Sequence, residues 1–445
     1  MASIEKRVAA AVLKKIRARR GASSVSEGGP PPDCSGPVAP ARLRTAQFSD
    51  FRSVAELKTR WGLSPDSSEN WERLWLRNPA LAHAQFERPI GWVLEVNNRV
   101  VGYLGNISLL YRYRDQTLTA VSGSGLVVEP AYRALSVSLV AAFYRQKSVD
   151  LYLTTSAVEA VAKIAKAFKS DPLPQADYDT VLFWVLKTYP FAQALMKKLK
   201  INSTFSPVGG VLGSFLVGAD RVLRRRSPRP ISSALTVDEI DVKQVGDEFQ
   251  TFWIEKLKER PRLLTDRSPA VLRWHFDIPG DRGRTRILRC SKEGEFLGYA
   301  VLRSDLDAYG LLKSIIADLL VKCDDPAVVR ALFVEAYDRA KSEGSYVLEV
   351  LGFPQDIRRV CLEWNPYERR YPSCPFYYKA TDPTLHKTLS DGMVWYASPF
   401  DGDTSLIRPS YSSLSLPLNV PRVLTSDPGD NAAPGITAHE HTNVC

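Results

Sequence analysis

The chain has 445 residues, of which 44% are hydrophobic and 24% charged, so it is long enough for two globular cores. Its net charge of +10 is concentrated in two stretches: residues 1–45 carry +6 and residues 221–229 carry +5, which leaves about −1 for the rest. This distribution disfavours a nucleic-acid-binding face on the expected folded parts.

The six cysteines form no C-x-x-C pair, and the five histidines are scattered. The sequence therefore predicts no disulfide framework and no bound metal. The N-terminus has no apolar leader, and the longest apolar run, 208–218, is too short to cross a bilayer. Together these features predict a cytoplasmic protein.

Residues 1–45 are expected to form a basic, flexible extension. Within the first twenty residues, apolar positions recur every four residues among Lys and Arg, a pattern that suits an anionic membrane surface. A solvated, frayed end is the alternative. Peripheral contact with the inner face of a membrane is therefore one of two interpretations.

A first folded domain is expected at 46–200, with two short helices followed by strands and helices in alternation. The predicted elements are helices at 53–61 and 68–77, strands at 90–96, 100–109 and 117–128, a helix to about 147, a strand at 150–154, a helix at 156–169 and a strand at 178–186. This order favours a mixed α/β sheet.

The segment 125–143, GLVVEPAYRALSVSLVAAF, is the junction around which this domain is organised. An apolar strand breaks at Glu129-Pro130 and continues as a helix. A strand that enters a helix through small residues presents free N–H groups and the helix dipole, and both favour phosphate. Without glycine the backbone avoids positive φ, so we expect this loop to be mostly helical.

This junction resembles the acyl-CoA-binding motif of the GNAT superfamily of N-acetyltransferases, R/Q-x-x-G-x-G/A. Arg133 stands at the first position, whereas Ser136 and Ser138 replace both glycines. The resemblance covers about residues 88–186 and includes the order of the elements. It implies a phosphate-binding loop made of six residues: Arg133, Ala134, Leu135, Ser136, Val137 and Ser138.

The resemblance also implies acetyl-CoA, or another acyl-CoA, as co-substrate. Its thioester would lie against the backbone of the last strand residues, which are Leu126, Val127 and Val128. At the end of the next strand, Thr154 and Thr155 stand where the family often has a cofactor-binding Asn. As the alternative, they are ordinary strand-end residues.

Direct attack by an amine on the thioester needs a base and an acid. Glu129 is the candidate base, and a solvent-facing turn residue is its alternative. The family's acidic tyrosine corresponds to about Ala165, so that acid is missing. Tyr152 is the nearest phenol, although strand alternation can turn it into the core.

An apolar and basic linker is expected at 201–235, followed by a second domain at 236–400 that repeats the first. Its apparent matches pair Trp75 with Trp274, Gly102-Tyr103 with Gly298-Tyr299, Leu126 with Leu319, and the strand at Asp150 with the strand at Tyr346.

At the decisive point the second copy reads Lys322-Cys323-Asp324-Asp325-Pro326 and has no phosphate loop. The two aspartates suit a helix cap but repel a pyrophosphate. Strands at 376–379 and 393–398 are expected to complete the second sheet, and the Ser/Pro/Asp-rich tail 401–445 is expected to be disordered.

The resulting fold class is α/β with two GNAT-like folds in tandem, of which the first binds acyl-CoA. The predicted function is acyl transfer from CoA to an amine, such as an amino sugar or a cell-envelope glycan precursor, and the arrangement is similar to FemAB-type and polysaccharide-biosynthesis acyltransferases. Two alternatives stay open: a FemAB-like transferase that uses aminoacyl-tRNA, and a degenerate binding or scaffold protein. Oligomeric state is not predicted.

Overall fold

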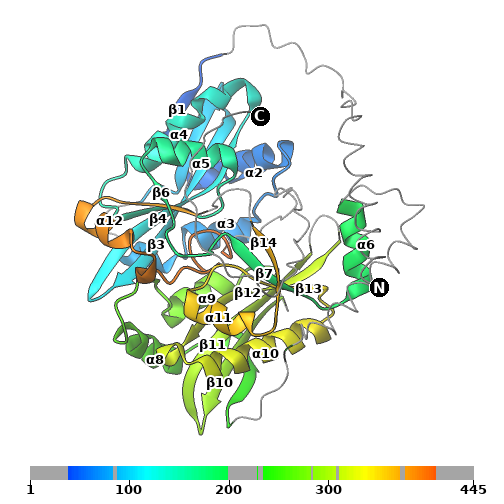
Figure 1. The fold of residues 1–445 in the computed structure, drawn as a ribbon. Coiled ribbons are helices and arrows are strands. Elements are labelled where there is room, and N and C mark those ends of the chain that lie inside the picture. The colour runs from blue at the N-terminus through cyan, green and yellow to red at the C-terminus, as the bar shows by residue number, and fades with distance from the viewer. Residues whose placement is uncertain are drawn as a thin grey trace, which may run out of the picture. The chain divides into compact units, whose positions relative to one another are not determined.

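The computed structural model describes residues 39–83, 88–198, 228, 234–281, 284–306, 310–370 and 376–406 (Figure 1). Nearly all of the predicted extension and most of the predicted linker at 201–235 lie outside these ranges. From Ala41 onward the described residues belong to one compact unit. The first sheet begins slightly before the expected start at residue 46, because Arg42–Thr45 already forms a strand.

The first half of the chain contains seven strands and five α-helices in the described part. The strands are β1 (Arg42–Thr45), β2 (Gly91–Val96), β3 (Arg99–Tyr113), β4 (Gln116–Val128), β5 (Leu151–Thr154), β6 (Asp171–Pro172) and β7 (Thr180–Val185). The helices are α2 (Phe51–Arg60), α3 (Ser68–Trp75), α4 (Ser136–Tyr144), α5 (Glu159–Ala167) and α6 (Thr188–Lys198).

The second half repeats this sequence of elements, again within the described ranges. Its strands are β8 (Thr236–Ile240), β9 (Leu264–Thr265), β10 (Thr285–Lys292), β11 (Glu295–Leu306), β12 (Leu312–Val321), β13 (Val347–Val350), β14 (Tyr367–Arg370) and β15 (Tyr377–Ala380). Its helices are α8 (Asp247–Leu257), α9 (Pro269–Phe276), α10 (Pro326–Ser342), α11 (Gln355–Leu362) and α12 (Pro383–Leu389).

Two mixed sheets have the same strand order. The first runs β1-β2-β3-β4-β5-β15-β6, with β9 paired to β3, and the second runs β8-β10-β11-β12-β13-β7-β14. In each sheet one step is parallel, β4 to β5 and β12 to β13, and the neighbouring pairs are antiparallel. This confirms the predicted mixed α/β class with two similar sheets.

The predicted internal repeat occupies equivalent places in the two sheets. Gly102 faces the last residue of β4, Val128, and Gly298 faces the last residue of β12, Val321. The two Gly-Tyr pairs that the sequence matched therefore occupy the same register positions in the two sheets.

The two halves exchange strands, which differs from our expectation, and the short strand β9 of the second half also pairs with β3. β7 was expected in the first sheet but pairs with β13 and β14, and the strand predicted at 376–379, β15, pairs with β5 and β6 instead of completing the second sheet. In Figure 1 the orange helix α12, which follows β15, accordingly lies beside strands of the first sheet. The sheets therefore cross the expected domain boundary at residues 200–236: β7 joins the second sheet, and β9 and β15 join the first.

The end of the described chain also differs from the prediction. Residues 392–394 form a short 3₁₀ turn, and only Trp395 makes a single bridge, to Leu263, so no strand forms at 393–398. The first residues of the tail predicted as disordered, 401–406, are folded and largely buried. One core cluster joins aromatic residues of both halves, including Trp71, Trp274 and Phe400.

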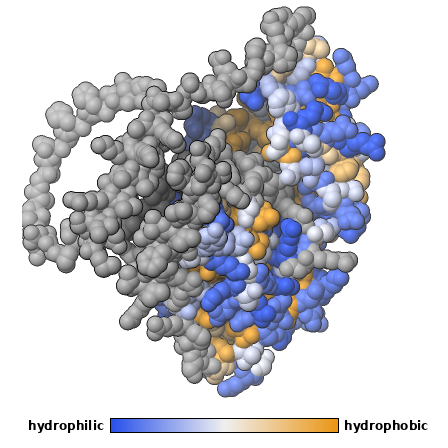
Figure 2. Space-filling model, turned by 90° about the vertical axis from the view of Figure 1, so that its right-hand side faces the viewer, coloured by the Kyte–Doolittle hydropathy of each residue, from blue (hydrophilic) through white to orange (hydrophobic). Residues whose placement is uncertain are grey.

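The described surface visible in Figure 2 is mostly hydrophilic, with small apolar patches scattered among polar residues. Among the helices that the structure describes, none combines the length and apolar character needed to span a bilayer.

Candidate functional site

Strands β4 and β5 separate at the point where the sequence predicted a ligand. They pair in parallel over three residue pairs, from Ala120↔Leu151 to Ser122↔Leu153, while β4 continues to Val128. On the β3 side, β4 has a bulge, because Gly125 and Leu126 together face Leu104. The predicted residue Leu126 thus belongs to the bulge, Val127 and Val128 follow it, and all three lie beyond the last β4–β5 pair.

The predicted phosphate loop is helical, as expected. A 3₁₀ turn, Pro130–Leu135, leads directly into α4 at Ser136. No side chain caps the start of α4, and the side chains of Arg133, Ala134 and Val137 are exposed. However, both the amide and the hydroxyl of Ser136 bond to the carbonyl oxygen of Arg133, the hydroxyl at 2.7 Å.

The remaining loop residues frame this end of α4: Leu135 and Ser138 are half-buried. An exposed guanidinium and an uncapped helix end suit an anionic group. The Ser136 hydroxyl, by contrast, is directed back to the turn. The loop therefore fits a diphosphate through Arg133 and the end of α4, and Ser136 would have to rotate in order to contribute.

Glu129, the predicted base, has a structural role. Its carboxylate receives hydrogen bonds from Arg99 at 2.9 and 3.0 Å and from Arg60 at 3.1 Å, and it is 8% exposed. Its amide donates to Val101 O on the neighbouring strand at 2.8 Å. Two guanidinium groups already occupy this carboxylate, so we do not assign proton transfer to it, and it is not the solvent-facing turn residue of the alternative either.

Tyr152, the predicted acid, points into the core, as strand alternation allowed. Its phenol donates to Gln146 O at 2.9 Å, and its ring lies 5.5 Å from that of Phe143 on α4. Burial raises the pKa of Tyr152 to about 12. Because the neighbouring Leu153 faces the opposite side of the sheet, Tyr152 is separated from the face that carries Ser122.

The two threonines at the end of β5, Thr154 in the strand and Thr155 directly after it, are occupied by protein contacts. Thr154 hydrogen-bonds the phenol of Tyr144. Thr155 is 3% exposed, donates to Asp403 at 2.8 Å and accepts from the Asp403 amide at 3.0 Å. In this arrangement the predicted cofactor contact at Thr155 is replaced by a contact with the C-terminal turn.

A polar cluster at the β4 bulge escaped the sequence-based search. Lys58 on α2 bonds to Asp66 at 2.7 Å, and Asn70 on α3 also donates to Asp66, at 2.9 Å. The Lys58 ammonium lies 5.5 Å from the centre of the Tyr103 ring, and a Cβ placed on Gly125 would be 3.4 Å from its Nζ.

A sequence signal for this cluster exists. Lys58 falls on the same helical face as the core residues Phe51 and Val54, at positions i, i+3 and i+7. A lysine on the apolar stripe of an amphipathic helix indicates a buried cation, because a solvated lysine belongs on the opposite face.

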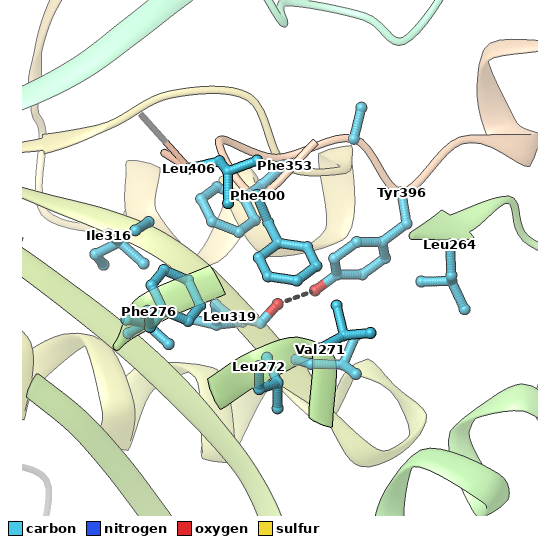
Figure 3. Close-up of a cluster of buried hydrophobic side chains, with 14 of the residues drawn as sticks. Leu264, Val271, Leu272, Phe276, Ile316, Leu319, Phe353, Tyr396, Phe400 and Leu406 are labelled. Atoms are coloured by element: carbon cyan, nitrogen blue, oxygen red, sulfur yellow. Dashed lines mark hydrogen bonds between the residues drawn. The ribbon is translucent and has the colours of Figure 1, made fainter. Parts of the chain in front are cut away.

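In the second half the equivalent region is filled by protein (Figure 3). The Tyr396 phenol donates to the carbonyl oxygen of Leu319 on β12 at 2.5 Å, and Phe400 packs beside it. At the end of β12, the Asp324 carboxylate pairs with Lys256 at 2.9 Å and with Arg262 at 3.0 Å. Of the two predicted aspartates, Asp324 thus pairs with these cations, and Asp325 caps α10 by accepting from Ala327 N.

The C-terminal turn Asp401-Gly402-Asp403 binds both halves. Asp401 accepts from Tyr111 at 2.7 Å and from Thr265 at 2.5 Å, while Asp403 accepts from Thr155 and Ser156. Burial raises the pKa of both carboxyls. Within the ranges that the structure describes, no group of three or more His, Cys, Asp or Glu residues is arranged to hold a metal ion.

No protein-family model matches the sequence, and no curated protein matches it with significant similarity. Solved structures do resemble the chain. A GCN5-related N-acetyltransferase from Kribbella flavida has a TM-score of 0.46 and 12% identity, over 77% of this chain and 71% of that one. One from Anabaena variabilis ATCC 29413 has a TM-score of 0.47 and 8% identity, over 77% and 73%.

A protein from Enterococcus faecalis V583 described as a probable N-acyltransferase has a TM-score of 0.48 and 10% identity, again over 77% and 73% of the two chains. The first two of these proteins are described as GCN5-related N-acetyltransferases. The likeness concerns the fold, and it specifies neither an acceptor nor a catalytic residue for this chain.

Proposed function

We propose that this protein is an acyl-CoA-dependent N-acyltransferase that uses acetyl-CoA, or another acyl-CoA, in its first half. The observation that carries the proposal is the separation of β4 from β5 after Ser122, together with the exposed Arg133 in the 3₁₀ turn that links β4 to α4, whose start no side chain caps. The crevice at the carboxyl ends of parallel strands is where α/β sheets bind ligands.

The chemistry requires little covalent help from the chain. An amine nitrogen bonds to the acyl carbon, the carbon–sulfur bond breaks, the amine loses a proton, and CoA leaves as a thiolate that takes up a proton. Backbone groups of Leu126–Val128 would orient the thioester, and Arg133 with the end of α4 would hold the diphosphate. With Glu129 and Tyr152 occupied, a water molecule is the proposed route for the amine proton.

The second half does not receive the same proposal. Its strand β12 also continues beyond its pairing with β13, but Tyr396 bonds to the carbonyl oxygen of Leu319 there. Its loop places Asp324, rather than an exposed cation, at the helix entrance. We assign to this half the support of the fold and the shaping of the acceptor site. The acceptor is an amine, with amino sugars and glycan precursors as the proposed class.

Calorimetric titration of the full-length protein with acetyl-CoA tests the proposal. We expect saturable binding that Arg133→Glu weakens by at least about tenfold, because one diphosphate-binding charge is reversed. Arg359→Glu, an equally exposed charge reversal on α11, is the matched control and should leave binding unchanged. Absence of binding in the parent protein would refute the transferase and favour a degenerate binding or scaffold protein.

A transferase that uses aminoacyl-tRNA is the other candidate, and the charge distribution disfavours it. Such an enzyme needs a basic surface, whereas the chain outside residues 1–45 and 221–229 is close to neutral. Binding of tRNA that survives at physiological salt, without binding of acetyl-CoA, would reverse this preference.

A further inference from the structure

The Lys58 ammonium is buried and incompletely hydrogen-bonded. Its side chain is 8% exposed and that of Asp66 is 9% exposed. An ammonium has three donors, and within the described residues Asp66 is its sole hydrogen-bond acceptor. The Tyr103 ring faces it at 5.5 Å but accepts no conventional hydrogen bond. A buried donor without an acceptor is costly, so the arrangement suits a ligand oxygen.

Lys58 lies at the bulge of β4. Gly125 has φ +64°, and a Cβ there would come within 3.3 Å of Lys58 Cε and 3.4 Å of Nζ. Glycine at this bulge therefore lets the ammonium approach the strand backbone. On the same strand, the buried Ser122 Oγ has no hydrogen-bond partner in the described part of the chain. Among the described residues, the Lys58 ammonium thus has donors without acceptors, and the Ser122 hydroxyl has no partner, where β4 separates from β5.

The second half also has a buried cation beside the equivalent strand, but there a carboxylate on the strand neutralises the charge. Counted back from the last residue of each strand, Gly125 in β4 corresponds to Asp318 in β12. Asp318 binds a fully buried cation, Arg267, through two hydrogen bonds of 3.0 Å, and it also accepts from Tyr299 at 2.8 Å.

A third bond, from Arg267 to Thr265 O at 3.0 Å, helps to satisfy that guanidinium. The rings of Tyr396 and Phe400 cover it. The second half therefore pairs its buried cation, Arg267, with a carboxylate on the strand itself. The first half has Gly125 at that position, and two donors of the Lys58 ammonium stay available.

We infer that Lys58 is a catalytic residue of the first half, and that its ammonium binds the carbonyl oxygen of the acyl thioester and stabilises the negative charge that develops there during transfer. The inference rests on the proposed acyl-CoA function. Asp66 and Asn70 are positioning residues, which hold the ammonium at the bulge. A fixed cation aimed at a developing oxyanion, in a site closed to water, is an effective source of transition-state stabilisation.

The test compares two variants that differ only in the ammonium. Asp66→Asn keeps Lys58 and a neutral hydrogen-bonding partner, whereas Lys58→Met/Asp66→Asn removes both charges and leaves no unpaired carboxylate in the fold. Lys163→Met, on the exposed face of α5, controls for loss of a lysine elsewhere. All are full-length proteins, and circular dichroism and calorimetry with acetyl-CoA precede the comparison.

The first readout is the carbonyl stretch of bound acetyl-CoA carrying ¹³C in the acetyl carbonyl, from isotope-edited infrared difference spectra. We expect a lower wavenumber in the parent, in Lys163→Met and in Asp66→Asn than in the double variant. The second readout is hydrolysis of saturating acetyl-CoA, in which water takes the acetyl group and CoA leaves as the thiol. Thiol release should be at least about 100-fold slower in the double variant than in Asp66→Asn.

Equal stretches and equal rates in Asp66→Asn and the double variant, with binding intact, would overturn the role of Lys58 and leave the proposed function standing. If the parent does not bind acetyl-CoA, both the proposed function and this inference fall. These two failures are distinguished by the titration alone.

Discussion

Replacement of Leu182 by Ala tests the strand exchange. Leu182 is fully buried in β7 and faces Val350 of β13 on one side and Glu368 of β14 on the other. Truncation of a leucine at such a site costs about 3–5 kcal/mol, because the cavity is added to the lost transfer free energy. A loss of about 3 kcal/mol raises the opening constant of the affected segment by roughly two decades.

Hydrogen exchange resolved by peptide mass spectrometry locates that opening. We expect Leu182→Ala to accelerate exchange in β13 and β14, which lie far along the chain from the substitution. Leu153→Ala is the matched control, because Leu153 is equally buried in β5 and faces Ser122 and Tyr378. It should accelerate exchange in β4 and β15 instead.

Acceleration in β5 on truncation of Leu182, with β13 and β14 unaffected, would refute the exchange and return β7 to the first sheet. The hydrogen-exchange pattern of each variant is also compared with that of the parent in mild denaturant. This comparison distinguishes local opening from unfolding of the whole protein. In either outcome the readout assigns β7 to one of the two sheets.

Three further tests concern the buried charges and the glycine beside Lys58. Asp318→Asn should cost about 3–5 kcal/mol in denaturant titrations because Arg267 loses its partner, whereas the double variant that also carries Arg267→Met should recover most of this loss. Gly125→Ala should lower the unfolding free energy by about 1 kcal/mol or more, owing to its positive φ, and should slow acyl transfer by displacing Lys58. Burial raises the pKa of Asp401, so the stability that its carboxyl contributes is present at low pH and lost as the pH rises through the folded pKa. Asp401→Asn should therefore cost less near neutral pH than at about pH 4, as measured by unfolding free energies at both.

The local elements could be predicted from the sequence, but their partners could not. Periodicity located the hairpin of β2 and β3, the motif strand β4 and the helical loop after Glu129. All six residues of β7 are buried, so no alternation of polar and apolar positions indicates which sheet it joins. Pairing between strands about 200 residues apart is a tertiary property that local patterns do not encode.

The same distinction between local and tertiary properties explains which features of the candidate site the sequence could indicate. Arg133 and the end of α4 are as exposed as the motif requires, because a loop motif is a local property. The roles expected of Glu129, Tyr152 and Thr155 depended on what else packs against them. Each turned out to have a partner from another segment: Arg99, Gln146 and Asp403.

The C-terminal turn gives a physical reason for the second half to remain attached to the first. Asp401 binds Thr265 of the second half and Tyr111 of the first, and Asp403, two residues later, binds Thr155 after β5. A Cβ on Gly402 would come within 2.2 Å of Thr155, so the turn and the end of β5 are in direct contact.

Asp403 bonds to Thr155 directly after β5 and to Ser124 of β4, beyond the last β4–β5 pair, so the position of this end of β5 depends on the turn. Ser398 links this turn to Arg267 and Asp318. Its hydroxyl accepts from Arg267 and donates to Asp318, and its amide donates to Asp401. Through this turn, the half that lacks a phosphate loop can position the end of β5 beside the acyl-CoA site that we propose in the first half. It follows that substitutions at Asp318, although they lie in the second half, should change the affinity of the first half for acyl-CoA.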